Sequence, residues 1–113
     1  MSISRNFVRS ALAASAFVAL AAPAVAHHGF GLFQMDIMKK WSGTLTKMNL
    51  VNPHSYMELD VIDEKGKKVH MRCEMRAAAL LRRSGWSIEM FKPGSHVEIE
   101  GRPHRDDPAA CYI

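Results

Sequence analysis

The stretch SYMELDVIDEKGKKVHMRCEM, residues 55–75, decides the fold that we expect for this chain. Apolar and polar side chains alternate from Ser55 to Ile62, with Met57, Leu59 and Val61 on one face. Successive side chains of a β-strand point to opposite faces of the sheet. The alternation therefore predicts a half-buried strand.

The residues that follow predict the second half of a hairpin. The turn Asp63-Glu64-Lys65-Gly66 places a glycine where a positive φ is needed. After the turn, one face is apolar and consists of Val69, Met71, Cys73 and Met75. The other face is polar, with His70, Arg72 and Glu74. The methionines of these inward faces are expected to fill the core rather than to bind copper(I).

Working outward from the hairpin, residues 38–51 read as a first strand that Asn52-Pro53 ends, because proline has no N–H to give to a ladder. Residues 76–84 are rich in strong helix formers, and Gly85 follows as a helix-ending residue. His96 to Gly101 alternates again and Pro103 is expected to stop it. Residues 111–113 look like the start of a fifth strand.

This order predicts a mainly β protein, a small OB-like Greek-key barrel with one short helix between strands three and four. The helix would close one end of the barrel, and most of the last strand would be missing. A generic α+β sandwich is the alternative, and the order of elements does not exclude it.

The first 26 residues predict a secretory signal peptide. Arg5 and Arg9 form a basic start, residues 11–20 are apolar, and Ala24-Val25-Ala26 fits a cleavage site. The apolar run is shorter than the roughly 18–20 residues of a membrane span, although a retained N-terminal anchor remains the alternative. We expect cleavage after Ala26, which leaves residues 27–113 as a single OB-like periplasmic domain without a membrane span.

Cleavage also changes the charge. The whole chain has 15 Lys+Arg and 11 Asp+Glu, but two arginines leave with the signal, so the mature domain carries a net charge of about +2. A small excess of positive charge without a basic stripe does not predict a nucleic-acid partner.

Five short motifs resemble those of one family. They are residues 26–30 (AHHGF), 43–47 (GTLTK), 52–54 (NPH), 80–86 (LLRRSGW) and 101–108 (GRPHRDDP). Together they are similar to a family of small exported bacterial proteins of unknown function, numbered 6152. The resemblance implies a periplasmic location and no known activity. Members usually continue through a full last strand, whereas this chain stops at Ile113. We therefore expect either an open barrel or a truncated sequence, and an open edge would be an aggregation hazard.

The new N-terminus is the most informative candidate site. Cleavage after Ala26 gives His27 a free α-amine, so the amine and the ring Nδ1 could chelate one metal ion. Both nitrogens lose their protons at modest cost near neutrality, and nitrogen ligands suit copper(II). The arrangement resembles the histidine brace of copper-dependent polysaccharide monooxygenases and of some periplasmic copper carriers, which need a second histidine from the fold.

In an OB-like barrel the loops between strands one and two and between strands four and five border the same binding face. His54 lies in the first loop and His104 in the second, with Asp106 and Asp107 close behind. We expect His27, His54 and His104 to form a metal site, in which His28 could replace His54. The alternative is that these residues only build turns, with the aspartates capping backbone N–H groups.

Several other residues are expected to be structural. His70 and His96 should lie on the surface, and Trp41 and Trp86 should pack in or at the end of the barrel. Two pairs of acidic residues, Glu58 with Asp60 and Glu98 with Glu100, should be solvated. Cys73 and Cys111 form an even pair, which an oxidising compartment would join, but a parallel pairing could hold them too far apart. Disulfide and free thiols both remain open.

The sequence contains no recognisable catalytic constellation, so an enzyme would have to rest on redox chemistry at the metal. We expect a periplasmic copper-binding protein for storage, delivery or tolerance. The alternative is an accessory or structural binding module that uses the same barrel face for an unidentified periplasmic protein or small ligand, without a metal.

Overall fold

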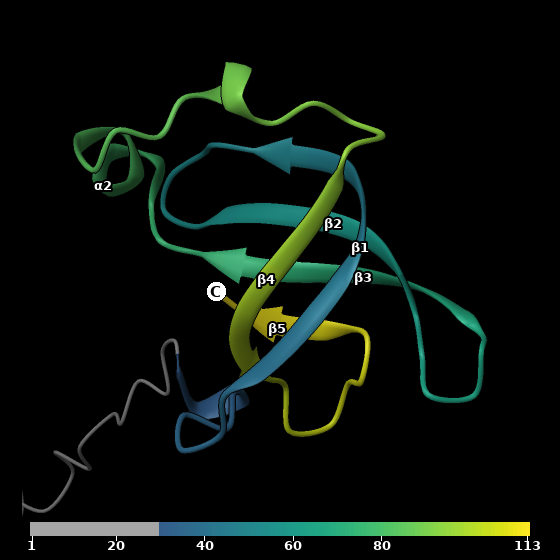
Figure 1. Ribbon diagram of the computed structural model, residues 1–113. Helices are drawn as coiled ribbons and strands as arrows, with labels where there is room; N and C mark the ends of the chain where they lie inside the picture. The colour runs from purple at the N-terminus through teal and green to yellow at the C-terminus, as the bar shows by residue number, and fades with distance from the viewer. Residues whose placement is uncertain (1–29) are drawn as a thin grey trace, which may run out of the picture.

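The computed structural model describes residues 30–113, which form a small β-barrel with one short α-helix (Figure 1). The elements in chain order are the 3-10 turn η1 (Phe30–Leu32), β1 (Lys39–Asn49), β2 (Ser55–Ile62), β3 (Lys68–Met75), α2 (Ala78–Arg83), the 3-10 turn η2 (Ile88–Met90), β4 (His96–Pro103) and β5 (Ala110–Tyr112). No helix in this part of the chain has the length and apolar content to cross a bilayer.

The five strands close into a barrel in the order β1-β2-β3-β5-β4. All neighbours are antiparallel except β3 and β5, which run parallel. The mainly β, OB-like architecture with a helix between the third and fourth strands is therefore confirmed. The expected open edge is wrong, because three residues of β5 are enough to pair with β3 on one side and β4 on the other.

The hairpin of β2 and β3 forms where it was predicted, with the apolar faces of both strands on the same side. Ser55 lies opposite Met75 and Ile62 lies opposite Lys68, without a bulge between them. Gly66 has a φ of 75°, a value that glycine adopts without strain. The Asp63 carboxylate accepts the N–H groups of residues 65 and 67, both at 2.9 Å, and so closes the turn.

β1 is shorter than predicted at both ends and pairs with two partners, β2 and β4. A bulge between Leu45 and Lys47 increases its bend, and a bent strand of this kind is what closes a small barrel. At Gly43 a Cβ atom would lie 2.2 Å from the backbone oxygen of Asp60, so the close approach of β1 to β2 requires glycine there.

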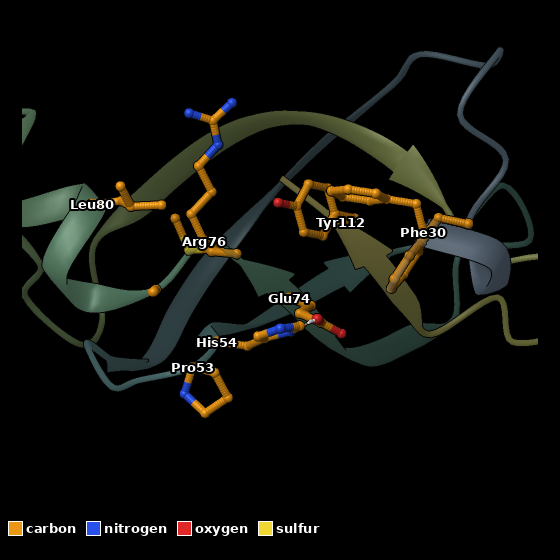
Figure 2. Close-up of a pocket in the computed structure, with 10 residues that line it drawn as sticks. Phe30, Pro53, His54, Glu74, Arg76, Leu80 and Tyr112 are labelled. Carbon is orange, nitrogen blue, oxygen red and sulfur yellow. Dashed lines mark hydrogen bonds and ion pairs between the residues drawn. The ribbon is translucent and has the colours of Figure 1, made fainter. Parts of the chain in front are cut away.

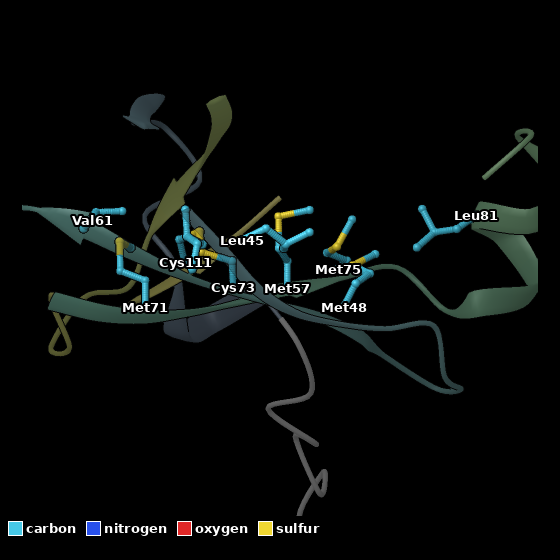
Figure 3. Close-up of a cluster of buried hydrophobic side chains, with 10 residues drawn as sticks. Leu45, Met48, Met57, Val61, Met71, Cys73, Met75, Leu81 and Cys111 are labelled. Carbon is cyan, nitrogen blue, oxygen red and sulfur yellow. A yellow bond between two sulfur atoms is a disulfide. The ribbon is translucent and has the colours of Figure 1, made fainter. Parts of the chain in front are cut away.

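The core lies inside the barrel and follows the alternation read from the sequence (Figure 3). Its buried side chains are Leu45, Met48, Met57, Leu59, Val61, Met71, Cys73, Met75, Leu81 and Cys111. The strand methionines Met48, Met57, Met71 and Met75 are core residues, as predicted, whereas Met35, Met38 and Met90 are exposed. Trp41 and Trp86 are partly buried against this cluster, and Trp86 stacks on Phe91 with ring centroids 5.3 Å apart.

Cys73 and Cys111 form a disulfide. They lie directly opposite each other on β3 and β5, with their Cα atoms 4.4 Å apart. A parallel pairing could have held the two residues too far apart, but it does not, because β5 pairs only with the C-terminal half of β3, from Arg72 to Glu74. The last strand is therefore joined covalently to the barrel.

α2 spans six residues, fewer than predicted, and closes one end of the barrel through the buried Leu81 (Figure 3). The Asn52 side-chain oxygen accepts the N–H of Ala79 in the first turn. Gly85 follows the helix with a φ of 92°, as expected of a helix-ending glycine. β4 extends to Pro103 rather than ending before it, and the Pro103 carbonyl accepts the N–H of Gln34 at 2.9 Å.

Candidate functional site

The segment that follows the expected N-terminus is tied to the end of β4. Phe33 is 4% exposed and forms an isolated antiparallel bridge with His104. The Leu32 carbonyl accepts the Arg105 N–H at 2.9 Å, and the Gly31 carbonyl accepts the Arg105 side-chain N–H at 3.0 Å. These contacts hold residues 30–34 against the β4–β5 loop, although Phe30 itself stays 53% exposed.

A pocket of about 410 Å³ lies between this segment and the β1–β2 loop (Figure 2). Its lining includes Phe30, Phe33, His54, Glu74, Leu80 and Tyr112. Phe30 and Tyr112 meet edge to face with ring centroids 5.0 Å apart, which fixes the aromatic side of the pocket. Residues from the N-terminal segment, β3, α2 and the C-terminus thus converge on one site.

His54 lies on the opposite side of the pocket, where its Nδ1 contacts the Oε1 of Glu74 (Figure 2). The next residue, Ser55, is fully buried and its hydroxyl exchanges hydrogen bonds with the backbone of Val51, which anchors the loop. The His54 side chain is 43% exposed and that of Glu74 is 20% exposed. Because a carboxylate only accepts, the ring donates from Nδ1, which leaves Nε2 as the nitrogen that carries the lone pair in the neutral form of the ring.

His104 has a different environment. Its Nδ1 accepts the N–H groups of Asp106 and Asp107 at 3.1 and 3.0 Å, and its ring meets Phe33 edge to face at 5.5 Å. The Asp107 carboxylate accepts the N–H of Ala109 at 2.8 Å. These hydrogen bonds form a turn, which agrees with the alternative interpretation of this motif.

The structure does not bring His54 and His104 into one pocket. His54 lines the pocket, whereas His104 is not among its lining residues and instead meets the ring of Phe33, which lines it. Within residues 30–113, no three His, Cys, Asp or Glu side chains are grouped closely enough to hold a metal ion. His27 and His28, the other two expected ligands, lie outside the described residues.

Glu74 is the pocket residue that sequence reasoning missed. The alternation of the sequence puts it on the polar face of its strand, and no pattern there predicts a role in the site. The available signal was the hairpin register, because Ser55 lies opposite Met75 and so brings the loop before it next to Glu74. Tyr112 was missed for a related reason, since its position depends on the pairing of β5.

A second polar cluster occupies the outer face of β2 and β3. His70 contacts Asp60 through Nδ1 at 2.8 Å and Glu58 through Nε2 at 3.2 Å, and Lys68 pairs with Asp60 at 3.1 Å. The hydrogen bond to Asp60, followed by that to Glu58, raises the pKa of His70 above its ordinary value. His70 and then Lys68 lower the pKa of Asp60. His70 is exposed, as is His96, which contacts Ser42; the surface positions predicted for both are confirmed.

Comparison with known proteins gives one family and no named relative. A sequence search finds no match among curated proteins. Residues 14–111, most of the chain, match the model of a family of unknown function, DUF6152. The motifs of the mature chain that resembled family 6152 lie largely within this match, and the chain belongs to that family of unknown function.

Proposed function

We propose that this protein binds one copper(II) ion in the periplasm, for storage, delivery or tolerance, with His27 and His54 as ligands. The observation that carries the proposal is the contact of His54 Nδ1 with Glu74 in a pocket bordered by Phe30. Histidines that bind metals usually donate their other ring N–H to a carboxylate or a carbonyl, which fixes the tautomer and the ring orientation. Nε2 of His54 is then the coordinating atom.

The chain length between the two ligands supports their convergence. His27 and His28 precede Phe30 by three and two residues. A fully extended chain covers at most about 3.6 Å per residue, so His27 lies within about 11 Å of Phe30. Phe30 and His54 line the same pocket. Either histidine can therefore reach the site while residues 30–34 keep their contacts.

The expected donor set favours copper(II). A free α-amine with a reference pKa near 8 and imidazoles near 6.5 deprotonate at small cost when a metal binds near neutral pH. Among divalent first-row metals, copper(II) binds nitrogen ligands of this kind most tightly. Glu74 is a negative charge next to the site that orients His54 and offsets part of the charge of the ion.

His104 fits this ligand set less well. Its Nδ1 accepts two backbone N–H groups, so the ring proton is on Nε2. Coordination through Nε2 would require that proton to move to Nδ1, towards two donors. The proposed ligands are therefore His27 and His54, with His28 as the alternative to His54, and His104 could join them only after its turn opens.

One observation supports export, which the free amine of His27 requires. Cys73 and Cys111 form a disulfide, and disulfides persist mainly in oxidising compartments such as the periplasm.

Isothermal titration with copper(II) tests the ligand set on protein that begins at His27. Loss of the outer partner of a metal ligand typically weakens binding 10–100-fold, so Glu74→Gln should weaken copper(II) binding by about 10–100-fold. His54→Ala removes a ligand itself and should weaken binding by more than that. His96→Ala is the matched control, since His96 is an exposed histidine that does not line this pocket. If His54→Ala left the affinity for copper(II) unchanged, His54 would not be a ligand.

A second candidate function is an accessory module that binds a protein or a small ligand without a metal. The pocket favours it through Phe30 and Leu80, which are 53% and 45% exposed, because exposed apolar side chains around a pocket often mark an interaction site. Folded protein that begins at His27 and shows no tight copper binding would select this function over the first.

A further inference from the structure

The barrel has a second binding surface at the end that α2 does not cover. Figure 3 shows Leu81 of α2 at one end of the core cluster and Val61 and Met71 at the other. A groove of about 730 Å³ opens at the Val61 end, between the start of β1 and the β2–β3 turn. It shares no lining residue with the His54 pocket.

The floor of this groove is apolar. Val61 and Met71 are core side chains, 6% and 1% exposed, that also line the groove. Trp41 and Val69, both partly buried, extend the surface, and Ile62 is 65% exposed. The volume lies in the range of small-molecule sites, which are typically apolar clefts with a few polar groups at defined positions.

The rim carries net positive charge. Four lysines line the groove, at positions 39, 40, 65 and 67, against two acidic residues, Asp63 and Glu64. Lys40 pairs with Glu100 at 3.1 Å, and the carboxylate of Asp63 is engaged by backbone N–H groups of the turn. Among residues 30–113, no ion pair engages the other three lysines, and the ammonium of Lys39 lies 5.6 Å from the ring centroid of Trp41.

We propose that this groove binds a small amphiphile, a single anionic group such as a carboxylate on an apolar chain. The apolar chain lies on Trp41, Val69 and Met71, and the anionic group faces Lys39 and the lysines of the β2–β3 turn. A lysine rim above an apolar floor complements both parts of such a molecule. Without the floor, the rim would be only a solvated charged surface. The inference does not depend on the copper site.

Tryptophan fluorescence tests the proposal, because Trp41 lines the groove and Trp86 does not. Trp86→Phe leaves Trp41 as the reporter and keeps an aromatic ring against Phe91. Sodium decanoate below its micelle concentration should give a saturable change in emission. Butyrate, which lacks the chain, and decyl glucoside, which lacks the charge, should each bind at least about tenfold more weakly. Methyl shifts of Met71 in the unmodified protein give a second readout.

Charge variants distinguish binding by the lysines of the rim from a general effect of the protein's net charge. The double substitution of Lys39→Gln and Lys67→Gln should weaken decanoate binding by at least about tenfold, and Lys47→Gln with Lys92→Gln, outside the groove, should leave it unchanged. Equal binding of decanoate and decyl glucoside would overturn the proposal. A response to vesicles of anionic phosphatidylglycerol, with no response to monomeric decanoate, would also overturn the proposal, since the surface would then recognise a membrane.

Discussion

Removal of the disulfide is expected to destabilise the barrel strongly. Cys73 and Cys111 are 38 residues apart, and closing a loop of that length in the unfolded chain is worth about 4 kcal/mol in the loop-entropy model. A domain of this size has a free energy of unfolding of roughly 4–13 kcal/mol, so the loss is a large part of the total. With a urea m-value of about 1–3 kcal/mol/M, the midpoint of unfolding should fall by at least about 1.3 M.

The assay is urea unfolding followed by tryptophan fluorescence, for the oxidised protein, the reduced protein and the variant with Cys73→Ala and Cys111→Ala. Both cysteines are fully buried, so the alanine variant also loses packing, whereas the reduced protein keeps its sulfur atoms and isolates the cross-link. Amide exchange should accelerate at Ile113, whose N–H donates to Glu74 at 2.8 Å. A reduced protein whose midpoint lies within about 0.5 M of the oxidised one would refute the reasoning.

Two further predictions concern His70 on the outer face of the barrel and the close approach of β1 to β2 at Gly43. The raised pKa of His70 means that its bonds to Asp60 and Glu58 stabilise the fold fully below the unfolded pKa of histidine and progressively less as pH rises through the folded pKa. His70→Gln should therefore lower the urea midpoint more at pH 5.5 than at pH 9, and an equal decrease at both would contradict this. Gly43→Ala should cost about 1–3 kcal/mol because its Cβ would meet the Asp60 oxygen at 2.2 Å, whereas Gly31→Ala, with nothing within 4 Å, should be close to neutral in the same unfolding assay.

The sequence predicted those parts of the fold that depend on local pattern. The β2–β3 hairpin follows from a period of two and a turn glycine, so its position and the apolar faces of its strands agree with the structure. Closure of the barrel and formation of the disulfide depend instead on which part of β3 pairs with β5. Both follow from the three residue pairs between these two strands. No local pattern around Cys111 specifies that register, and the sequence alone left both questions open.

The candidate site divides in the same way. Asn52-Pro53-His54 was recognisable as a loop with a histidine, and the structure places that histidine in a pocket beside Phe30. Its partner Glu74 lies on the polar face of its strand, where its sequence position does not distinguish it from a solvated acidic residue. Only the pairing of β2 with β3 brings it next to the loop. The hydrogen bonds of His104 depend on the local conformation of the β4–β5 loop, which residue types do not specify.

One titration tests the central claim most directly, because a metal chelated by the amine and the ring of His27 requires that amine to be free. Copper(II) is titrated into protein that begins at His27 and into the same protein with one glycine added before His27. The account predicts tight one-to-one binding to the first and a loss of most of that affinity, about 100-fold or more, in the second. Equal affinities for copper(II) would contradict it.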